Sequence, residues 1–541
     1  MTRQSLETIL NLNKLQVINI LKTSCQGGGR TTRLLFNKIM KRLFLKSISL
    51  AAGLTVLAAC SDAVDATAVI SRNNDFTGRG NIDEPLLTIV ISADSNAFCV
   101  RNVKFVLNAD ANDVSAIKLI QDSVVLVEKK VNSRHQNYSV HCKVASDSTV
   151  TLQLCADIRD NATEGNIVSA DIKSIHVGKS KIIPEPMEPG GREVLLCRKC
   201  LYRPGDYGSN YWRIPAILQL SDGTLLTVND RRNVVQDDLP NQIDVVSRYS
   251  TDGGRSWSEP VFIAKNGGRM FGFGDPGLAE LEDGTVICTF CGGQRLDKSC
   301  WEDPQRSYFA VSKDHGRTWS EPENITSSIW GPDPVNPFCK RYNSSFFSSG
   351  NSLVLKSGPH KGRMLVANVC TYDSWRGLCN HAVYTDDGGR TWNVSELAYA
   401  DKGDEAKMVE LLDGRILMSI RQNGNRAYVI SEDGGQSWSE PSFWDEICTN
   451  ACNGDLIRYN DSILLHSVPN SMKRENVSIF LSYDEGRTWP EHKSICHGRS
   501  VYSSLTVLAD GTIGAYLEED PTGACELWYE NFSLEWLQNR K

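Results

Sequence analysis

One octapeptide that recurs five times limits the folds open to this chain of 541 residues more than any other feature. Its first copy runs from Ser250 to Trp257 and has the pattern Ser/Thr-x-Asp-x-Gly-x-Ser/Thr-Trp. The aspartates of the five copies, at positions 252, 314, 387, 433 and 484, are 62, 73, 46 and 51 residues apart. A repeat of this length indicates a propeller or another repeat array rather than a single layered core.

Each copy contains the chemistry of a tight turn. The aspartate accepts hydrogen bonds from N–H groups of the turn, and glycine allows a positive φ. The tryptophan is expected to pack beneath the turn and fix it to the next strand. Asp/Gly turns also occur in calcium loops, but no bidentate Glu follows here at the required distance. Asp252 and its four counterparts are therefore predicted to be structural rather than metal-binding.

Asp-Gly pairs between apolar runs predict β-hairpins in the same region, at Asp222-Gly223, Asp283-Gly284, Asp413-Gly414 and Asp510-Gly511. Most of them precede an octapeptide, which is consistent with one four-stranded blade per repeat. At roughly 50–60 residues per blade, residues 195–541 predict a six-bladed β-propeller in which one blade lacks the octapeptide.

The region before the propeller has a different pattern. Short alternating apolar runs between 85 and 183, such as Leu86–Ile91 and Thr149–Leu154, predict a small β-sandwich. The polar, acidic-leaning residues 61–84 are expected to form a tether, and the Pro- and Gly-rich residues 184–194 a linker. The predicted fold class is therefore all-β, with a sandwich followed by a propeller.

Composition limits the partners and cofactors. The net charge of −7 argues against nucleic acid as the main partner. Twelve Trp and sixteen Tyr fit a turn-rich β protein and also a sugar-binding one, because aromatic rings stack on pyranose faces. The pairs Cys197/Cys200 and Cys288/Cys291 fall in an expected linker and an expected strand, so no zinc site is predicted.

The N-terminal region carries an export pattern. A basic stretch, Met40–Lys46, precedes apolar and small residues 48–59, which are too few to span a bilayer. The following Leu57-Ala-Ala-Cys60 resembles the lipobox of bacterial lipoproteins. This resemblance implies cleavage before Cys60, lipidation of its thiol and anchoring to the outer membrane, at the cell surface or the periplasmic face. Residues 1–60 are interpreted as an N-terminal extension and signal peptide, with translation starting at Met40.

The propeller region resembles the sialidase superfamily. The octapeptides match its Asp boxes, which non-enzymatic propellers also carry, and Tyr211–Ala216 matches its Arg-Ile-Pro motif. The resemblance covers nearly all of 195–541 and implies an exo-α-sialidase (neuraminidase). Some bacterial sialidases also have a domain like the predicted sandwich, which either binds carbohydrate or acts as a rigid spacer.

The resemblance places substrate-binding arginines. Sialic acid has a carboxylate on its anomeric carbon, and guanidinium groups bind carboxylates with a bidentate geometry that lysine lacks. The three arginines of the family match Arg213, Arg421 and Arg474. The glutamate that orients the first arginine matches Glu518, with the adjacent Glu519 as the alternative.

The nucleophile implied by the resemblance is a tyrosine. A carboxylate nucleophile would be repelled by the carboxylate of the substrate, and sialidases use Tyr in its place. The tyrosine of the family matches Tyr502, and a phenol with a pKa of about 10 needs a neighbouring base. That base matches Glu405. Glu410 is the alternative, and strand alternation allows only one of the two to face the site.

The loop after the strand of Arg213 is expected to hold the acid/base carboxyl group. Its sequence matches the family with Asp238 as acid/base and the adjacent Asp237 as the alternative. Arg232 then matches a further arginine near the ring substituents of the sugar, and Asp275 a position on its amide side.

These residues together predict a retaining exo-α-sialidase that releases terminal sialic acid from host glycans without a metal or another cofactor. A non-catalytic sialoglycan-binding propeller is the alternative from another class, and it would be expected to lack Tyr502, Glu405 or the acid. A trans-sialidase or an anhydro-forming enzyme would use the same residues, so the sequence leaves that choice and the preferred linkage open.

Overall fold

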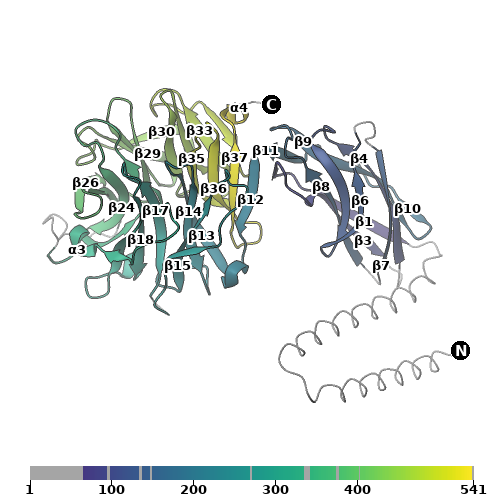
Figure 1. Cartoon of the computed structure of the whole chain (residues 1–541), viewed down its shortest axis with the longest axis horizontal. Coiled ribbons are helices and arrows are strands. Elements are labelled where there is room, and N and C mark those ends of the chain that lie inside the picture. Colours follow the sequence, from purple (N-terminus) through teal and green to yellow (C-terminus); the bar gives the residue numbers. More distant parts are fainter. Residues whose placement is uncertain are drawn as a thin grey trace, which may run out of the picture.

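The computed structural model describes residues 65–93, 98–132, 137–146, 149–268, 271–333, 342–372, 377–400 and 402–538. Nearly all of their regular structure is β-strand, arranged in two units (Figure 1). Met40, Cys60 and the rest of the predicted signal peptide lie outside the described residues. In the described part of the chain, no helix is long and apolar enough to cross a membrane. The predicted all-β class is confirmed.

The N-terminal unit is a sandwich of two sheets. Its strands are β1 (Ala66–Arg72), β2 (Phe76–Gly78), β3 (Glu84–Ala93), β4 (Phe98–Asn108), β5 (Val114–Gln121), β6 (Val124–Lys130), β7 (Asn137–Ser146), β8 (Thr149–Ile158), β9 (Ile167–Val177), β10 (Ser180–Ile182) and β11 (Arg192–Leu195). One sheet has the order β1-β3-β8-β5-β6 and the other β2-β11-β9-β4-β7, with β10 beside β9. Alternate residues of β8 and β4, such as Leu152, Leu154, Val103 and Phe105, fill the core between them.

The predicted tether is corrected by this sheet arrangement for its described residues 65–84, and the predicted linker over 184–194 is too long by the residues of β11, which starts at Arg192. Strand β1 pairs with β3 along its whole length, and β2 pairs in parallel with β11. Small side chains at Ala66 and Ala68 and the larger Ile70 pack against the core, while Arg72 forms an ion pair with Asp171 at 2.6 Å. The polar composition of this segment did not indicate strands, because its strands form by pairing with β3 and β11, which lie elsewhere in the sequence.

The C-terminal unit consists, in its described residues, of six sheets with four main strands each. The first blade contains β13 (Tyr211–Gln219), β14 (Leu225–Arg232), β15 (Ile243–Ser250) and β16 (Val261–Ala264), and the second contains β17 (Phe273–Glu280), β18 (Val286–Gly293), β19 (Gln305–Ser312) and β20 (Glu323–Asn324). The third contains β21 (Tyr342–Phe347), β24 (Met364–Tyr372), β25 (Leu378–Thr385) and β26 (Asn393–Tyr399), and the fourth contains β27 (Ala406–Glu410), β28 (Ile416–Ile420), β29 (Gly424–Ser431) and β30 (Ser442–Thr449). The fifth contains β31 (Asp455–Asn460), β32 (Ile463–Pro469), β33 (Val477–Ser482) and β34 (Glu491–Ser494), and the sixth contains β35 (Ser500–Val507), β36 (Ile513–Glu519), β37 (Glu526–Phe532) and β12 (Cys197–Tyr202). The short strands β22 (Gly350–Asn351) and β23 (Leu353–Val354) join two of these sheets. Helical segments are short: η1 (Asp206–Gly208), η2 (Leu296–Lys298), α3 (Thr326–Ile329) and α4 (Leu534–Gln538).

The octapeptides occupy the turn between the third and fourth strands of their blades. In the first copy, Asp252 accepts hydrogen bonds from the backbone N–H and the hydroxyl of Ser256 at 2.9 and 2.5 Å. The last blade has no such turn, because its fourth strand, β12, comes from the beginning of the propeller region. This closure explains why six blades share five octapeptides.

The octapeptide tryptophans contact the preceding blade. Trp319 donates its indole N–H to Ser247 Oγ of β15 at 3.2 Å, and Trp489 packs edge-on against Trp444 of β30 with ring centroids 5.4 Å apart. The Asp-Gly pairs lie between the first and second strands, as Asp222-Gly223 does between β13 and β14. Local turns thus define each blade, and the tryptophans hold neighbouring blades together.

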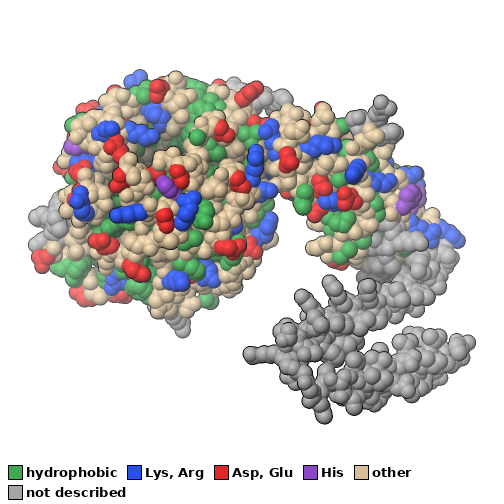
Figure 2. Space-filling view, viewed as in Figure 1, with side chains coloured by type: hydrophobic (Ala, Val, Ile, Leu, Met, Phe, Trp, Pro, Cys, Tyr) green, Lys and Arg blue, Asp and Glu red, His purple; other side chains and the backbone are tan. Residues whose placement is uncertain are grey.

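Sandwich and propeller share a packed interface. Phe76 of β2 is fully buried, stacks on His497 with centroids 4.9 Å apart and meets the edge of Trp536. Arg198 of β12 lies 3.3 Å from Asp75, and the Trp536 indole donates to Glu193 at 2.7 Å. Acidic and basic side chains are interspersed over the visible face of both units (Figure 2).

Candidate active site

The predicted site residues meet in one cleft at the centre of the propeller, with a volume of about 1220 Å³. The first strands of neighbouring blades contact one another around this centre, which brings together residues far apart in sequence. The lining includes Arg213, Arg232, Asp237, Asp238, Asp275, Glu405, Arg421, Arg474 and Tyr502. Glu518 lies beneath the cleft, with a fully buried side chain.

Irregular pairing in three of the first strands shapes this site. The register of β13 shifts between Arg213 and Ala216, that of β17 between Gly274 and Gly277, and that of β35 between Ser500 and Ser503. Ile214 and Asp275 have φ values of 62° and 56°, a region that non-glycine residues rarely adopt. Such bulges redirect side chains, and here they lie beside Arg213, Asp275 and Tyr502.

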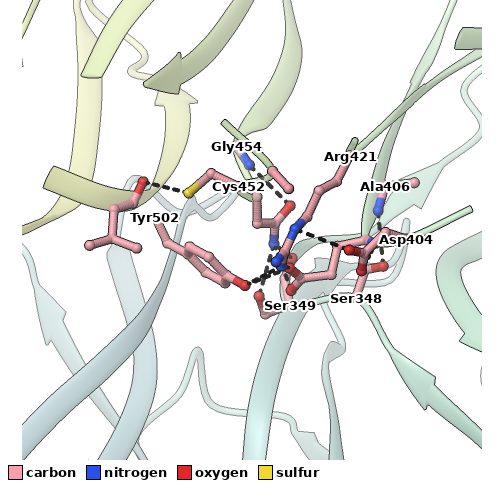
Figure 3. Close-up of polar contacts among 12 residues, drawn as sticks. Ser348, Ser349, Asp404, Ala406, Arg421, Cys452, Gly454 and Tyr502 are labelled. Atoms are coloured by element: carbon pink, nitrogen blue, oxygen red, sulfur yellow. Dashed lines mark hydrogen bonds and ion pairs between the residues drawn. The ribbon is translucent and has the colours of Figure 1, made fainter. Parts of the chain in front are cut away.

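Tyr502 and Glu405 form a close pair at the cleft floor. The Tyr502 hydroxyl donates to Glu405 Oε2 at 2.5 Å, and Arg421 Nη1 donates to the Tyr502 oxygen at 2.8 Å (Figure 3). Burial raises the pKa of Tyr502 well above its ordinary value, the charge of Glu405 adds to this shift, and Arg421 opposes it. Tyr502 is therefore a protonated phenol whose proton has a carboxylate acceptor in place.

The two candidate bases are separated along β27. Glu405 precedes the strand at its cleft end, where it is 2 % exposed. Glu410 ends the strand and accepts hydrogen bonds from the backbone N–H groups of Lys356 and Ser357 at 2.6 and 3.0 Å. The geometry therefore favours Glu405 as the partner of Tyr502.

The two candidate glutamates of β36 point to opposite faces. Glu518 accepts hydrogen bonds from Arg213 Nε at 2.6 Å and from the backbone N–H groups of Ile214 and Tyr502. Glu519 instead forms an ion pair with Arg198, near the sandwich. Glu518 thus holds Arg213 and strand β35 together.

The three predicted arginines differ in their partners. Arg213 is paired with Glu518, whereas Arg421 contacts Glu405 and lies 3.2 Å from Asp404. Arg474 donates to the carbonyl of Ala451 at 3.3 Å and has no carboxylate within ion-pair distance among the described residues. At Arg474 an anionic ligand would therefore meet a guanidinium group that no carboxylate among the described residues neutralises.

A second cluster of charged side chains surrounds Arg232. Arg232 contacts Asp230 at 2.9 Å and Asp238 at 2.7 Å. Desolvation works against ionisation of Asp238, but Arg232 and Arg213 outweigh it and lower its pKa. Asp237 also lines the cleft, and none of the described residues forms an ion pair with its side chain. The contact with Arg232 favours Asp238 as the positioned carboxyl group.

Asp230 and Asp404 belong to the site, although the sequence motifs assigned no role to either. Asp230 also accepts the backbone N–H of Asp275 at 3.0 Å, and burial raises its pKa to about 6 against the effect of Arg232. Burial likewise raises the pKa of Asp275 well above its ordinary value, with added effects of Asp230 and Asp238. The only sequence signal for Asp230 and Asp404 was that each lies close to a predicted site residue. Asp230 lies two residues before Arg232, and Asp404 immediately precedes Glu405.

The described residues contain no group of three or more His, Cys, Asp or Glu side chains arranged to hold a metal. The Cys197 thiol donates to the carbonyl of Gly254, and Cys200 to that of Tyr202. Cys288 and Cys291 are both buried in β18.

Comparison with known proteins agrees with this architecture. The chain is 34% identical over 376 residues to a sialidase of Micromonospora viridifaciens, covering 65% of this chain and 56% of that protein. It is 29% identical over 387 residues to a sialidase of Bacteroides fragilis, covering 65% and 68%. An anhydrosialidase of Macrobdella decora is 24% identical over 448 residues, with 58% of each chain covered. The chain thus spans little more than half the length of the first of these relatives.

Solved structures share the fold. The Hadza microbial sialidase Hz136 superposes with a TM-score of 0.69 at 19% identity, over 86% of this chain and 99% of that one. The intramolecular trans-sialidase of Ruminococcus gnavus gives 0.55 at 19% identity, over 63% and 99%. Residues 216–515 match the family described as BNR repeat-like domain. Because this match covers more than half of the chain, the protein belongs to the BNR repeat-like domain family and has sialidases among its relatives.

Proposed function

We propose that this protein is a retaining exo-α-sialidase that removes terminal sialic acid from glycans through a covalent tyrosyl intermediate. The observation that carries the proposal is the Tyr502–Glu405 hydrogen bond of 2.5 Å in a cleft that Arg213, Arg421 and Arg474 also line. Its sialidase relatives add support.

In this mechanism, the arginines bind the carboxylate of the substrate and thereby place the anomeric carbon against Tyr502. Asp238, in its protonated form, gives its proton to the glycosidic oxygen as the bond to the anomeric carbon breaks. The Tyr502 oxygen bonds to that carbon, and the phenol proton moves to Glu405.

The second step reverses these proton transfers. Water attacks the anomeric carbon, and the Asp238 carboxylate takes one of its protons. The bond from Tyr502 to the sugar breaks, and Glu405 returns the proton to the phenol. Two displacements at the same carbon leave its configuration unchanged.

The proposal is tested with residues 61–541 and a fluorogenic aryl α-sialoside. We expect the wild-type protein to release sialic acid, and Tyr502→Phe to reduce kcat at least about 10³-fold while still binding the sugar, because it loses the nucleophile but keeps the arginines. A wild type that binds sialic acid without turnover would instead establish the alternative, a sialoglycan-binding propeller.

Transfer within the substrate is the second candidate, because an anhydrosialidase and intramolecular trans-sialidases are among the similar proteins. Mass spectrometry of the product separates the two. Hydrolysis adds the mass of water to the sialyl group, whereas the anhydro product lacks it.

We further propose that lipidated Cys60 anchors the protein to the outer membrane. The support is the sequence Leu57-Ala-Ala-Cys60 after an apolar stretch. Fractionation of bacteria that express the full chain should find the wild type in the membrane pellet and Cys60→Ser in the soluble fraction. Equal distribution of both proteins would exclude this anchor.

A further inference from the structure

We propose that Asn453 is a positioning residue that decides which oxygen of Glu405 accepts the Tyr502 proton. This inference rests on the proposed function, since it assigns a role within the same proton transfer. Asn453 does not line the cleft and is 3 % exposed, so it would act through Glu405 rather than on the substrate.

The two oxygens of Glu405 have separate partners. Oε2 accepts the hydrogen bond from Tyr502 at 2.5 Å and a further one from Arg421. Oε1 accepts a hydrogen bond from the Asn453 side-chain amide at 3.3 Å. The terminal torsion of Glu is broad when nothing restrains it. A donor on Oε1 restricts rotation of the carboxylate and leaves Oε2 facing Tyr502.

Asn453 is itself held in place. One of its two amide N–H bonds is shared by the hydroxyl and the carbonyl of Ser349, at 3.0 and 3.2 Å, which leaves the other for Glu405, and its carbonyl oxygen accepts the backbone N–H of Gly454 at 3.0 Å. These contacts fix which end of the amide faces Glu405. Figure 3 shows Ser349 and Gly454 beside Arg421 and Tyr502.

Three segments that the propeller brings together supply this contact. Ser349 precedes β22, Glu405 precedes β27, and Asn453 lies between β30 and β31. Because Asn453 holds Oε1, Oε2 remains the oxygen in contact with the Tyr502 hydroxyl. The proton taken from Tyr502 therefore stays on Oε2, from which it returns to the phenol in the second step.

The test measures kcat, KM and their pH profiles for Asn453→Asp with a fluorogenic aryl α-sialoside. The variant keeps the shape of the side chain but replaces the donor with an oxygen. We expect kcat at neutral pH to fall about 10²-fold, because base catalysis contributes about 10²–10⁴-fold, with KM changed less than about threefold. The optimum of kcat should move to lower pH, because the introduced carboxyl group can again donate to Glu405 once it is protonated.

A second variant and a control complete the design. Ser349→Ala removes one anchor of Asn453 and should lower kcat several-fold without changing KM, and it decides the question if Asn453→Asp fails to fold. Asn450→Asp introduces the same charge at a position whose side-chain amide donates to the Met472 carbonyl, away from Glu405, and it should behave like wild type.

Each outcome has a distinct meaning. The role of Asn453 alone would be overturned if Asn453→Asp kept the wild-type kcat and pH profile while the wild type turned over and Tyr502→Phe was inactive. An inactive wild type would overturn the proposed function first.

Discussion

At the scale of single residues, the cleft holds carboxyl groups in contrasting environments. Arg232 lowers the pKa of Asp238, whereas burial raises that of Asp275. In the free protein Asp238 is therefore ionised at neutral pH. In the proposed mechanism, a bound substrate carboxylate would offset the positive charge of Arg213 and Arg474 and help Asp238 to hold the proton that it donates.

This environment yields a prediction that separates Asp238 from Asp237. Asp238→Asn should lower kcat/KM about 10²–10⁴-fold on a sialyl-oligosaccharide, whose leaving group needs a proton, and much less on an aryl sialoside, whose leaving group does not. Asp237→Asn, which alters the adjacent carboxyl group in the same cleft, should stay within a few-fold on both. The reverse pattern would move the acid to Asp237.

At the scale of elements, the octapeptide turns link pH to stability. In the fifth copy, Asp484 accepts hydrogen bonds from the backbone N–H and hydroxyl of Thr488 at 2.9 and 2.7 Å. Burial opposes its ionisation, but these bonds lower its pKa below the ordinary 3.8. A lowered pKa in the folded state contributes stability above the ordinary value, and this contribution is lost as the pH falls through the folded value.

Asp484→Ala should therefore reduce the free energy of unfolding by about 1–3 kcal/mol at neutral pH, because its turn donors lose their acceptor. The difference from wild type should shrink below about pH 4, where unfolded Asp binds protons. Denaturant titrations at pH 7 and pH 3 measure both effects. Asp461→Ala, at an exposed turn position, is the matched control and should change stability by less than about 0.5 kcal/mol. Equal effects of the two substitutions would contradict the role of the octapeptide.

At the scale of the whole molecule, the sandwich is joined to the propeller by apolar packing and by charge. Phe76 belongs to the sandwich sheet but packs in a propeller core cluster with Leu195, Ile495 and Trp536. Beside it, Arg198 contacts Asp75, Glu519 and the buried Glu530, and burial raises the pKa of Glu530 to about 8 against the effect of Arg198. The packing makes the sandwich a fixed extension of the last blade.

Truncation of the interface residue should therefore destabilise the propeller. Phe76→Ala is expected to lower the unfolding free energy of the propeller by about 3–5 kcal/mol, because a fully buried ring is lost. Calorimetry and the thermal loss of sialoside binding report on the propeller. Phe105→Ala, the same truncation inside the sandwich core, should leave propeller melting nearer to wild type. An unchanged propeller transition in Phe76→Ala would show that the two units are independent.

The sequence alone determined the features that arise from local chemistry. The octapeptide sets the turn between the third and fourth strands through bonds such as those from Ser256 to Asp252, within four residues. Five such turns and the Asp-Gly hairpins were enough to predict six blades. The motif resemblance was enough to name Arg213, Arg421, Arg474, Glu405 and Tyr502 among the residues that line the cleft, because each motif is short and continuous.

Only the tertiary structure decided what depends on distant pairing. Strand alternation predicted that Glu405 and Glu410 face different ways. Only the ring of blades shows that Glu405 is the one that meets Tyr502, which lies 97 positions later. The tertiary structure likewise decided the pairing of β1 within the sandwich, the place of β12 in the last blade and the contact of Asn453 with Glu405. The physical reason is that hydrogen-bond partners within a turn are fixed by the local backbone, whereas partners across a closed ring are fixed only once every blade is in place.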